Sequence, residues 1–493
     1  MKRALILMLA LLMSCSSLIA CGDTTPSGSD DTSPADTTTV EETTADPGPQ
    51  LEIPQSNFDG HKVTYLMVTD YDKNFKLCVA NEDGETLNDA GYKRELAVKE
   101  LLNVTFGSYQ VAAAEVSKTL AAAVQAGVTD YEIVLPHGSN GTAAIVTNGS
   151  LLDWNSLNHV DFTKPWWNAS MQNSLSIGDK LMYASGDLVI TWQGTQAILF
   201  NKDYLIGEKA KENLYQLVLD GKWTFDKMMD LSKGVAQDLN GDSKMGPEDR
   251  YGLLTPLNNT TVRTFAYGFG ETGAVKNEQG CPVLGYSSAR MATVVDKLYA
   301  VTHSPDAYYD NYGSTTYHES VYRSILDSGR AFLTMLDIGG LYNFLRDIEF
   351  EFGILPLPKL DETQEQYYTF CGAGIIGIPV NTVNPDRTAI VMEALQYYSY
   401  EHVRPAFFDI VLQNKALRDK ESYEMMTIIQ NTKIFDVGFH MDTSGKGGVN
   451  ALYKIIVTDN STDYVSYLKS VEESVNKGYK KLYDAVMGNT AAK

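Results

Sequence analysis

One part of this chain alternates between strand-like and helix-like patterns, and this alternation constrains the fold more than any other feature. Strands that alternate with helices form a parallel sheet covered by helices, so we expect an α/β fold. Ligands bind such sheets beyond the carboxyl ends of the strands, here at the loops after Val68 and Leu135. In order, the segments are strand His61–Val68, helix Leu87–Leu102, strand Val104–Tyr109, helix Glu115–Ala126 and strand Tyr131–Leu135.

A second region, Thr191–Phe350, shows the same kind of pattern. It opens with strand Ala197–Phe200 and continues through a helix for which Thr224 is a suitable N-cap. A short apolar strand, Phe332–Leu336, is followed directly by Asp337 and two glycines. Again a polar loop follows the carboxyl end of a strand, so Asp337 is a candidate ligand contact.

The size and charge of the chain limit its organisation and its partners. About 430 residues follow Phe58, which at ~150 residues per domain predicts two or three lobes. The residues after Glu401 have a mostly helical pattern. A formal net charge of −22 argues against nucleic acid or an anionic membrane surface as the partner, because both require a basic face.

The first twenty residues have the pattern of a signal peptide. Lys2 and Arg3 form a basic start, Ala4–Met13 is unbroken and apolar, and Ser14–Ala20 is rich in small residues. The apolar run is about half the ~20 residues that a membrane-spanning helix needs. Residues 1–20 are therefore expected to be removed on export.

The four residues Leu18-Ile19-Ala20-Cys21 resemble the lipobox of bacterial lipoproteins. The resemblance implies that the Cys21 thiol carries a diacylglycerol and becomes the new amino terminus. Two acyl chains, at ~0.8 kcal/mol per buried CH₂, hold a protein to a membrane almost permanently. The alternative is a chance cysteine in a signal tail.

Residues 21–56 are expected to form a disordered acidic stalk. Between Gly22 and Gln50 there are seven acidic residues, no basic residue and no aromatic one. Such a segment repels itself and cannot bury a core. Three cysteines remain beyond it, Cys78, Cys281 and Cys371, and we interpret them as buried apolar residues rather than a disulfide framework.

Several segments resemble the extracellular solute-binding proteins of family 1, the receptors of carbohydrate ABC importers. Each segment is short, but their order and spacing together are specific, and the resemblance covers nearly all of the chain after the stalk. The segments are Leu199–Lys202 with Asp203-Tyr204-Leu205 after it, Asn213–Phe225, Phe352–Lys359 and Ile376–Pro379.

The resemblance implies a two-lobed periplasmic-binding-protein-like fold of type II, in which a hinge joins the lobes and a ligand is trapped between them. On this template both lobes are discontinuous. Residues 57–188 plus 353–400 form lobe 1, and residues 189–352 plus 401–488 form lobe 2.

The resemblance also implies a function. We expect a membrane-anchored extracytoplasmic protein, not an enzyme, that captures a small solute, either a sugar or an oligosaccharide. Its expected partners are the permease subunits of an ABC importer and, through the lipid, the outer face of the cell membrane. A surface carbohydrate-active hydrolase and a binding lipoprotein that feeds a sensor remain alternatives.

A twelve-residue loop has the oxygen spacing of an EF-hand calcium site, with side chains at positions 1, 3, 5 and 12 and a carbonyl at position 7. The expected Ca²⁺ ion is structural. Ser243 replaces the usual glycine at position 6, and an aspartate replaces the bidentate glutamate at position 12, so binding should be weak. A polar turn without metal is the alternative. The expected ligands are Asp238, Asn240, Asp242, Lys244 through its carbonyl, and Asp249.

Tryptophans are candidates for stacking on a sugar ring. Trp192 is placed best, because the resemblance puts it and Gln193 in a segment that crosses between the lobes, close to the ligand. Trp166 is the second candidate. A role as a core anchor is the alternative for each tryptophan, and Trp223 is assigned to packing.

Polar residues follow the first and third expected strands of lobe 1. Carboxylates, amides and hydroxyls there would bond to sugar hydroxyls, together with Asp337 from lobe 2. For Ser139 and Asp337, capping of the next helix is the alternative. The expected contacts in lobe 1 are Asp70, Tyr71, His137, Ser139 and Asn140.

Motifs of known enzyme classes are absent from the sequence. We find no Gly-x-Ser-x-Gly, His-Glu-x-x-His, Walker or Cys-x-x-Cys pattern, and the seven histidines lack metal-ligand spacing. A glycosidase needs only two carboxylates, so sequence cannot exclude one, but no pair stands out.

Overall fold

A computed structural model describes residues 48–207, 209–310, 319–340, 348–372, 374–413 and 420–488. Contacts between Cα atoms group Pro49–Lys493 into one compact unit. The expected signal peptide, Cys21 and most of the expected stalk lie outside the described residues.

The first sheet is parallel, as the alternation of strands and helices predicted. β1 (His61–Val68) lies between β2 (Val104–Val111) and β3 (Ile133–Leu135). A later segment adds an antiparallel edge to this sheet, with Gly377 opposite Val134 in β3. The carboxyl ends of β1 and β3 therefore lie at one edge of the sheet.

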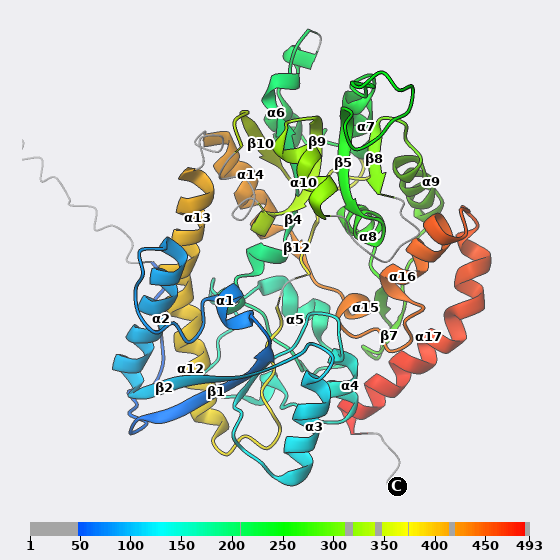
Figure 1. The fold of residues 1–493 in the computed structure, drawn as a ribbon. Coiled ribbons are helices and arrows are strands. Elements are labelled where there is room, and N and C mark those ends of the chain that lie inside the picture. Colours follow the sequence, from blue (N-terminus) through cyan, green and yellow to red (C-terminus); the bar gives the residue numbers. More distant parts are fainter. Residues whose placement is uncertain are drawn as a thin grey trace, which may run out of the picture. The chain divides into compact units, whose positions relative to one another are not determined.

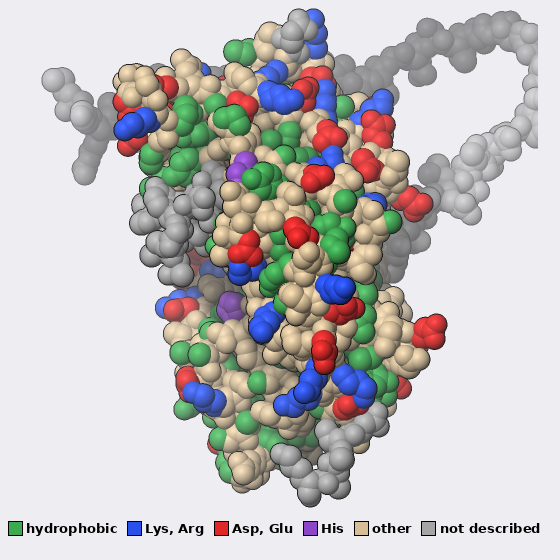
Figure 2. Space-filling view, turned by 90° about the vertical axis from the view of Figure 1, so that its right-hand side faces the viewer, with side chains coloured by type: hydrophobic (Ala, Val, Ile, Leu, Met, Phe, Trp, Pro, Cys, Tyr) green, Lys and Arg blue, Asp and Glu red, His purple; other side chains and the backbone are tan. Residues whose placement is uncertain are grey.

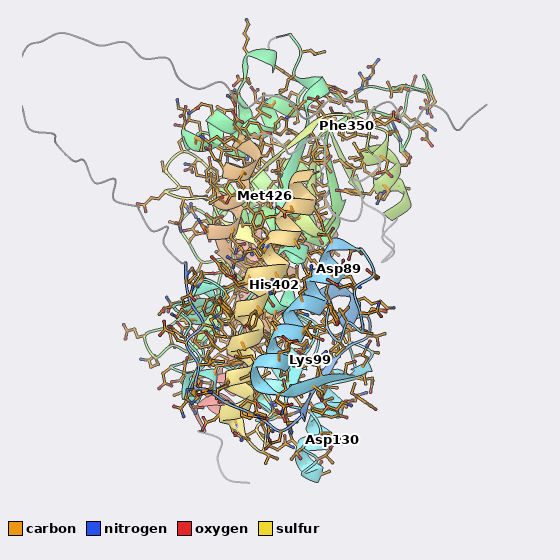
Figure 3. The ribbon with its side chains drawn as sticks, turned by 90° about the vertical axis from the view of Figure 1, so that its left-hand side faces the viewer. Asp89, Lys99, Asp130, Phe350, His402 and Met426 are labelled. Atoms are coloured by element: carbon orange, nitrogen blue, oxygen red, sulfur yellow. The ribbon has the colours of Figure 1, made fainter. Side chains whose placement is uncertain are left out.

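Long helices cover this sheet. α2 (Thr86–Leu102) buries Leu87, Val98 and Leu102 and ends where Asn103 adopts a left-handed conformation. It packs against α12 (Pro385–Tyr398), against the π-helical segment η6 (Ser399–Val403) and against α13 (Arg404–Gln413). Figure 3 shows α2, with Asp89 and Lys99, beside the helical column that carries His402.

The second sheet is mixed, with strand order β10-β4-β9-β5-β8. β5 is parallel to β8 and β9, whereas β4 is antiparallel to β9 and β10. Its strands are β4 (Gln196–Asn201), β5 (Tyr251–Leu257), β8 (Ala307–Asp310), β9 (Ala331–Asp337) and β10 (Phe352–Leu355). The α/β class and two-sheet architecture expected from the sequence are confirmed.

α7 (Phe225–Ser232) begins at the predicted cap. The Thr224 hydroxyl accepts the backbone N–H of Lys227 at 3.3 Å. The helix then buries Phe225, Met228 and Leu231, which are spaced so as to share one face. Trp223 is fully buried and donates to the Pro356 carbonyl at 2.9 Å, so its role is packing, as predicted.

Short segments connect the two sheets. η3 (Thr191–Gly194) precedes β4, while β11 (Thr369–Phe370) and β12 (Lys433–Ile434) pair in parallel. The Gly372 N–H donates to the Gly194 carbonyl at 2.9 Å, and Lys433 Nζ donates to the Thr191 hydroxyl at 2.8 Å. In Figure 1, β12 passes between the sheets, so these segments form the hinge.

The carboxyl-terminal helices contact elements that lie beside both sheets. α14 (Lys420–Asn431) packs on β10, whereas α13 packs on α2, beside the first sheet. α17 (Tyr464–Met487) contacts both α4 (Thr142–Thr147) and β7 (Pro282–Leu284). The lobe boundaries expected from the sequence stay predictions.

No described helix has the length and apolar character to cross a membrane. Acidic, basic and apolar side chains are interspersed on the face shown in Figure 2.

The other described elements are α1 (Tyr71–Phe75), α3 (Val116–Ala126), η1 (Trp154–Ser156), α5 (Ala169–Leu175), η2 (Asp187–Val189), η4 (Lys202–Tyr204), η5 (Lys209–Lys211), α6 (Leu214–Leu219), α8 (Asn258–Gly268), β6 (Ala274–Lys276), α9 (Met291–Thr302), α10 (Glu319–Asp327), α15 (Val437–His440), α16 (Gly448–Tyr453) and η7 (Lys454–Thr458).

Candidate functional site

Polar loops from both sheets meet the hinge at η3. Gln193 Nε2 donates to the Asn74 carbonyl of α1 at 2.7 Å, so η3 is tied to the loop after β1. From the other side, Gly339 packs so closely that a Cβ there would lie 2.9 Å from the Gln193 carbonyl oxygen. We call α1, η3 and residues Asp337–Gly340 the hinge junction. Four of the predicted contacts belong to it: Tyr71, Trp192, Gln193 and Asp337.

Asp337 ends β9 and caps the backbone that follows. Its Oδ1 accepts the N–H of Gly340 at 2.7 Å, which is the geometry of a helix N-cap. Burial raises the pKa of this carboxyl to about 6. The capping alternative for Asp337 thus has direct geometric support, while a second role at the junction stays a prediction.

Tyr71 and Asp70 have different surroundings. Tyr71 is partly buried, its ring lies edge-on to Phe75 at 4.8 Å, and burial raises its pKa to about 12. Asp70 is exposed and pairs with Lys73 at 2.7 Å. Tyr71 therefore presents an aromatic, hydrogen-bonding side chain beside the hinge, whereas the Asp70 carboxylate is engaged at the surface.

Trp192 is in the hinge, as predicted, but it is packed and not open. Only 2% of it is exposed, because the rings of Phe407 and Phe408 from α13 lie 6.1 and 4.7 Å from its own. Lys433 Nζ lies 4.2 Å from the ring centroid. Burial lowers the pKa of this amine to about 8. The core-anchor alternative matches this environment, and sugar stacking on Trp192 has no support from the geometry.

Trp166 is also a core anchor in this structure. It is fully buried and donates from its indole to Glu393 Oε1 at 2.8 Å, while Trp167 donates to Glu393 Oε2 at 2.9 Å. Its ring meets Tyr397 edge-on at 5.2 Å. Glu393 thus joins both indoles to α12, and Trp166 is not placed to contact a solute.

The loop after β3 exposes the three predicted residues together. The Ser139 N–H donates to His137 Nδ1, and the Asn140 N–H donates to the His137 carbonyl, each at 3.3 Å. α4 has Gly141 at its N-cap, so Ser139 does not have the capping role that was the alternative. Ser139 also lines a cavity of about 410 Å³ between α4 and α17, together with Thr142, Asp442 and Lys481.

His440, which the sequence analysis missed, ties this loop to α15, the helix that directly follows β12 and that we count with the hinge segments. Its Nδ1 donates to the Gly138 carbonyl at 2.6 Å, and its own carbonyl accepts from the Thr142 hydroxyl. Burial lowers the pKa of His440 to about 4, so the imidazole is neutral. The loop of His137 is thereby held beside α15.

Arg263, on α8, is a second residue that the sequence analysis missed. Its Cζ lies 4.8 Å from the ring centroid of Phe370 in β11 and 5.0 Å from that of Phe439 in α15. Gly372, two residues after Phe370, packs on both rings. Arg263 is therefore adjacent to two hinge segments. The polar run Asn258–Thr261 after an apolar segment is a sequence signal that could have indicated this place.

The predicted calcium loop is closed by hydrogen bonds to its own backbone. Asp238 accepts the N–H groups of Gly241 and Ser243, at 2.6 and 2.7 Å, and Asp249 accepts those of Leu239 and Gly246. Ser243 has φ 64°, the left-handed conformation for which this position usually has glycine.

The oxygens of this loop do not converge on a point. Among the described residues, no group of three or more histidine, cysteine, aspartate or glutamate side chains is arranged to hold a metal ion. The remaining predicted ligands also bond within the loop, since Asn240 accepts from Asp242, and Asp242 from Lys244. The polar-turn alternative matches this arrangement, and calcium binding stays a prediction.

Comparison with known proteins supports the fold and no more. No family model matches the sequence, and no curated protein does either. Solved structures of sugar-binding proteins superpose over most of the chain.

Three solved structures illustrate the similarity. The sugar-binding protein MalE from Xanthomonas citri is 11% identical, with a TM-score of 0.57 over 87% of this chain and 100% of that one. A cyclo/maltodextrin-binding protein complexed with maltotetraose is 14% identical, with a TM-score of 0.55 over 89% and 100%. An ABC transporter solute-binding protein from Thermotoga lettingae, bound with α-D-tagatose, is 13% identical, with a TM-score of 0.53 over 85% and 100%. The chain therefore has the two-lobed fold of these proteins.

Proposed function

We propose that this protein captures a small solute, a sugar or an oligosaccharide, outside the cytoplasmic membrane for an ABC importer. The observation that carries the proposal is the hinge junction. A loop after β1 and a loop after β9, from different sheets, both contact η3 through Gln193. A solute bound there would touch both sheets and so favour the conformation in which they are closed together.

The solved structures with this fold support a carbohydrate as the solute. A cyclo/maltodextrin-binding protein with this fold is complexed with maltotetraose, and an ABC transporter solute-binding protein with this fold is bound with α-D-tagatose. Binding without chemistry is the matching mode of action, so the protein is proposed not to be an enzyme. The proposed place of action is the outer face of the membrane, with Cys21 carrying the lipid.

Calorimetric titration of the purified full-length chain with a panel of glycans, amino acids and peptides tests the proposal. We expect one class of glycan to bind with unit stoichiometry. Gln193→Ala should weaken that binding roughly tenfold, since the junction loses a hydrogen bond worth about 1–1.5 kcal/mol. The control is Gln216→Ala on exposed α6, where the side chain bonds only to Asp220 in the described chain.

Four results would contradict the proposal or part of it. Binding of amino acids or peptides but no glycan would discard the carbohydrate. Turnover of a glycan would establish the alternative of a surface hydrolase. Equal affinity of the Gln193 variant and wild type would place the site away from the hinge junction. A histidine kinase gene beside this one, instead of permease genes, would favour the sensor alternative.

A further inference from the structure

The guanidinium of Arg263 is held between two aromatic rings. Phe370 and Phe439 meet edge-to-face, with centroids 5.1 Å apart, and Arg263 Cζ lies about equally far from each. Cation–π contacts of this kind attract the guanidinium to the negative faces of the rings. The rings therefore orient the guanidinium without neutralising its charge.

Among the described residues, this charge has no carboxylate partner. Arg263 Nη2 donates to the Thr260 hydroxyl at a long 3.3 Å, and the Nε atom is buried with no partner in the described chain. No described aspartate or glutamate forms an ion pair with it. Desolvation lowers the pKa of Arg263 from its ordinary value, and the group remains a cation at neutral pH.

Three other partly buried arginines of this protein are paired with carboxylates, whereas Arg250 and Arg330 donate to amide or carbonyl oxygens. Arg404 lies 2.7 Å from Asp187, Arg387 lies 2.7 Å from Glu132, and Arg290 lies 3.0 Å from Glu271. Leaving a buried charge uncompensated costs several kcal/mol, which is why such groups normally carry a counter-ion. Arg263 therefore differs from these arginines in lacking a described anion.

The position of Arg263 is close to the proposed solute site. Phe439 is followed by His440, which bonds the loop of His137 and Ser139. Phe370 is two residues from Gly372, whose N–H bonds the Gly194 carbonyl next to Gln193. The arginine is thus adjacent to β11 and α15, and residues that follow its two rings there bond to η3 and to the loop of His137 and Ser139.

We propose that Arg263 binds a carboxylate of the solute, and that the solute is an acidic saccharide containing a uronic acid. The inference rests on the proposed function and names its ligand class. A guanidinium can donate two parallel hydrogen bonds to a carboxylate, and such charge-assisted pairs are about twice as strong as neutral ones. A neutral sugar would leave the cation uncompensated.

The test compares an oligogalacturonide with its methyl-esterified form, which has the same rings without the charge. Both are titrated calorimetrically into the full-length chain, beside a neutral malto-oligosaccharide and a sulfated oligosaccharide. Wild type should bind the free acid at least tenfold more tightly than the ester, and increasing salt should reduce this preference. Tighter binding of the sulfated glycan than of the free acid would overturn the carboxylate assignment.

Variants separate a binding role from a packing role. Arg263→Gln should weaken binding of the free acid on the order of a hundredfold and leave the ester almost unchanged, because only the charged pair is lost. Arg263→Lys keeps the charge without the planar fork, and its affinity for the free acid should lie between those of wild type and Arg263→Gln. The control Arg323→Gln removes an arginine that pairs with Asp327 on α10, and should change neither affinity.

The outcomes distinguish the two proposals. If no glycan of any charge binds, the proposed function fails, and the ligand class with it. If the neutral glycan binds as tightly as the free acid, or Arg263→Gln leaves the acid affinity unchanged, only the role of Arg263 is overturned. If circular dichroism shows that neither Arg263 variant folds, the role of the charge is judged from wild type alone. Its preference for the acid over the ester, and the salt dependence of that preference, are then the test.

Discussion

Single buried polar residues join segments that are distant in the sequence. Glu393 accepts both indole N–H groups of Trp166 and Trp167. Burial raises the pKa of this carboxyl, while the two donors hold it down. Such a residue fixes its partners in place, because removing either the acceptor or a donor leaves a buried polar group without a hydrogen bond. His440 has the same character, and its titration makes a direct prediction.

We expect the protein to lose stability as the pH falls from 6.5 towards 4, in part through His440. Its pKa is about 4 in the folded chain against 6.5 as the ordinary value, so the unfolded chain binds the proton more tightly in this window. The loss at pH 4.5 relative to pH 7 should be roughly 2–3 kcal/mol. Urea unfolding at both pH values measures it.

The variant His440→Asn keeps a donor for the Gly138 carbonyl and removes the titration. The difference in the free energy of unfolding between the two pH values should therefore be smaller than in wild type by that amount. His159→Asn, at an exposed histidine with φ 66°, is the control and should behave as wild type. An unchanged pH dependence in His440→Asn would show that His440 does not titrate in this range.

At the scale of elements, the loop after α7 shows how a sequence pattern and a structure can agree in backbone and differ in chemistry. Ser243 adopts the left-handed conformation that the EF-hand pattern requires. The carboxylates of Asp238 and Asp249, however, bond to backbone N–H groups of the loop. These bonds tie the loop to its own backbone.

If the loop binds calcium, chelation should lower the melting temperature. Binding to the folded state alone stabilises it by about 2.7 kcal/mol when free calcium exceeds Kd a hundredfold. Asp242→Ala should abolish the difference between calcium and chelator, and Asp130→Ala, at an exposed site outside the loop, should preserve it. An identical melting temperature of wild type in both conditions would support the alternative, a polar turn without metal.

At the scale of the molecule, the described chain is one compact unit in which α17 contacts both sides of the hinge. Lys180 Nζ, near the first sheet, donates to the Val486 carbonyl at 2.9 Å, and Asn476 accepts the Leu284 N–H of β7 at 2.7 Å. Movement of one sheet relative to the other must therefore break contacts of α17 or carry it along. The proposed attachment of this unit to a membrane depends on residues before it.

The lipobox makes a prediction about that attachment. Labelled palmitate should enter the wild-type protein, whereas Cys21→Ser should be unlabelled and either uncleaved or released. Cys15→Ser is the control, because Cys15 lies six residues earlier within the expected signal peptide and should leave the label unchanged. Equal labelling of the Cys21 variant and wild type would refute Cys21 as the anchor.

The sequence by itself determined the local elements and the class of fold. β1 spans His61–Val68 and α7 begins after Thr224, as predicted, because strand alternation, helical spacing and capping depend on residues near each other in the chain. The loops after β1, β3 and β9 follow from the same patterns, since parallel strands direct their carboxyl ends to one edge.

Only the tertiary structure decided which side chains face the hinge and which are covered. Trp192 is buried because α13, more than two hundred residues later, places Phe407 and Phe408 against it. Arg263 is brought between Phe370 and Phe439 by β11 and α15. No local pattern encodes these contacts, because burial and the pairing of charges depend on segments that meet only when the chain is folded.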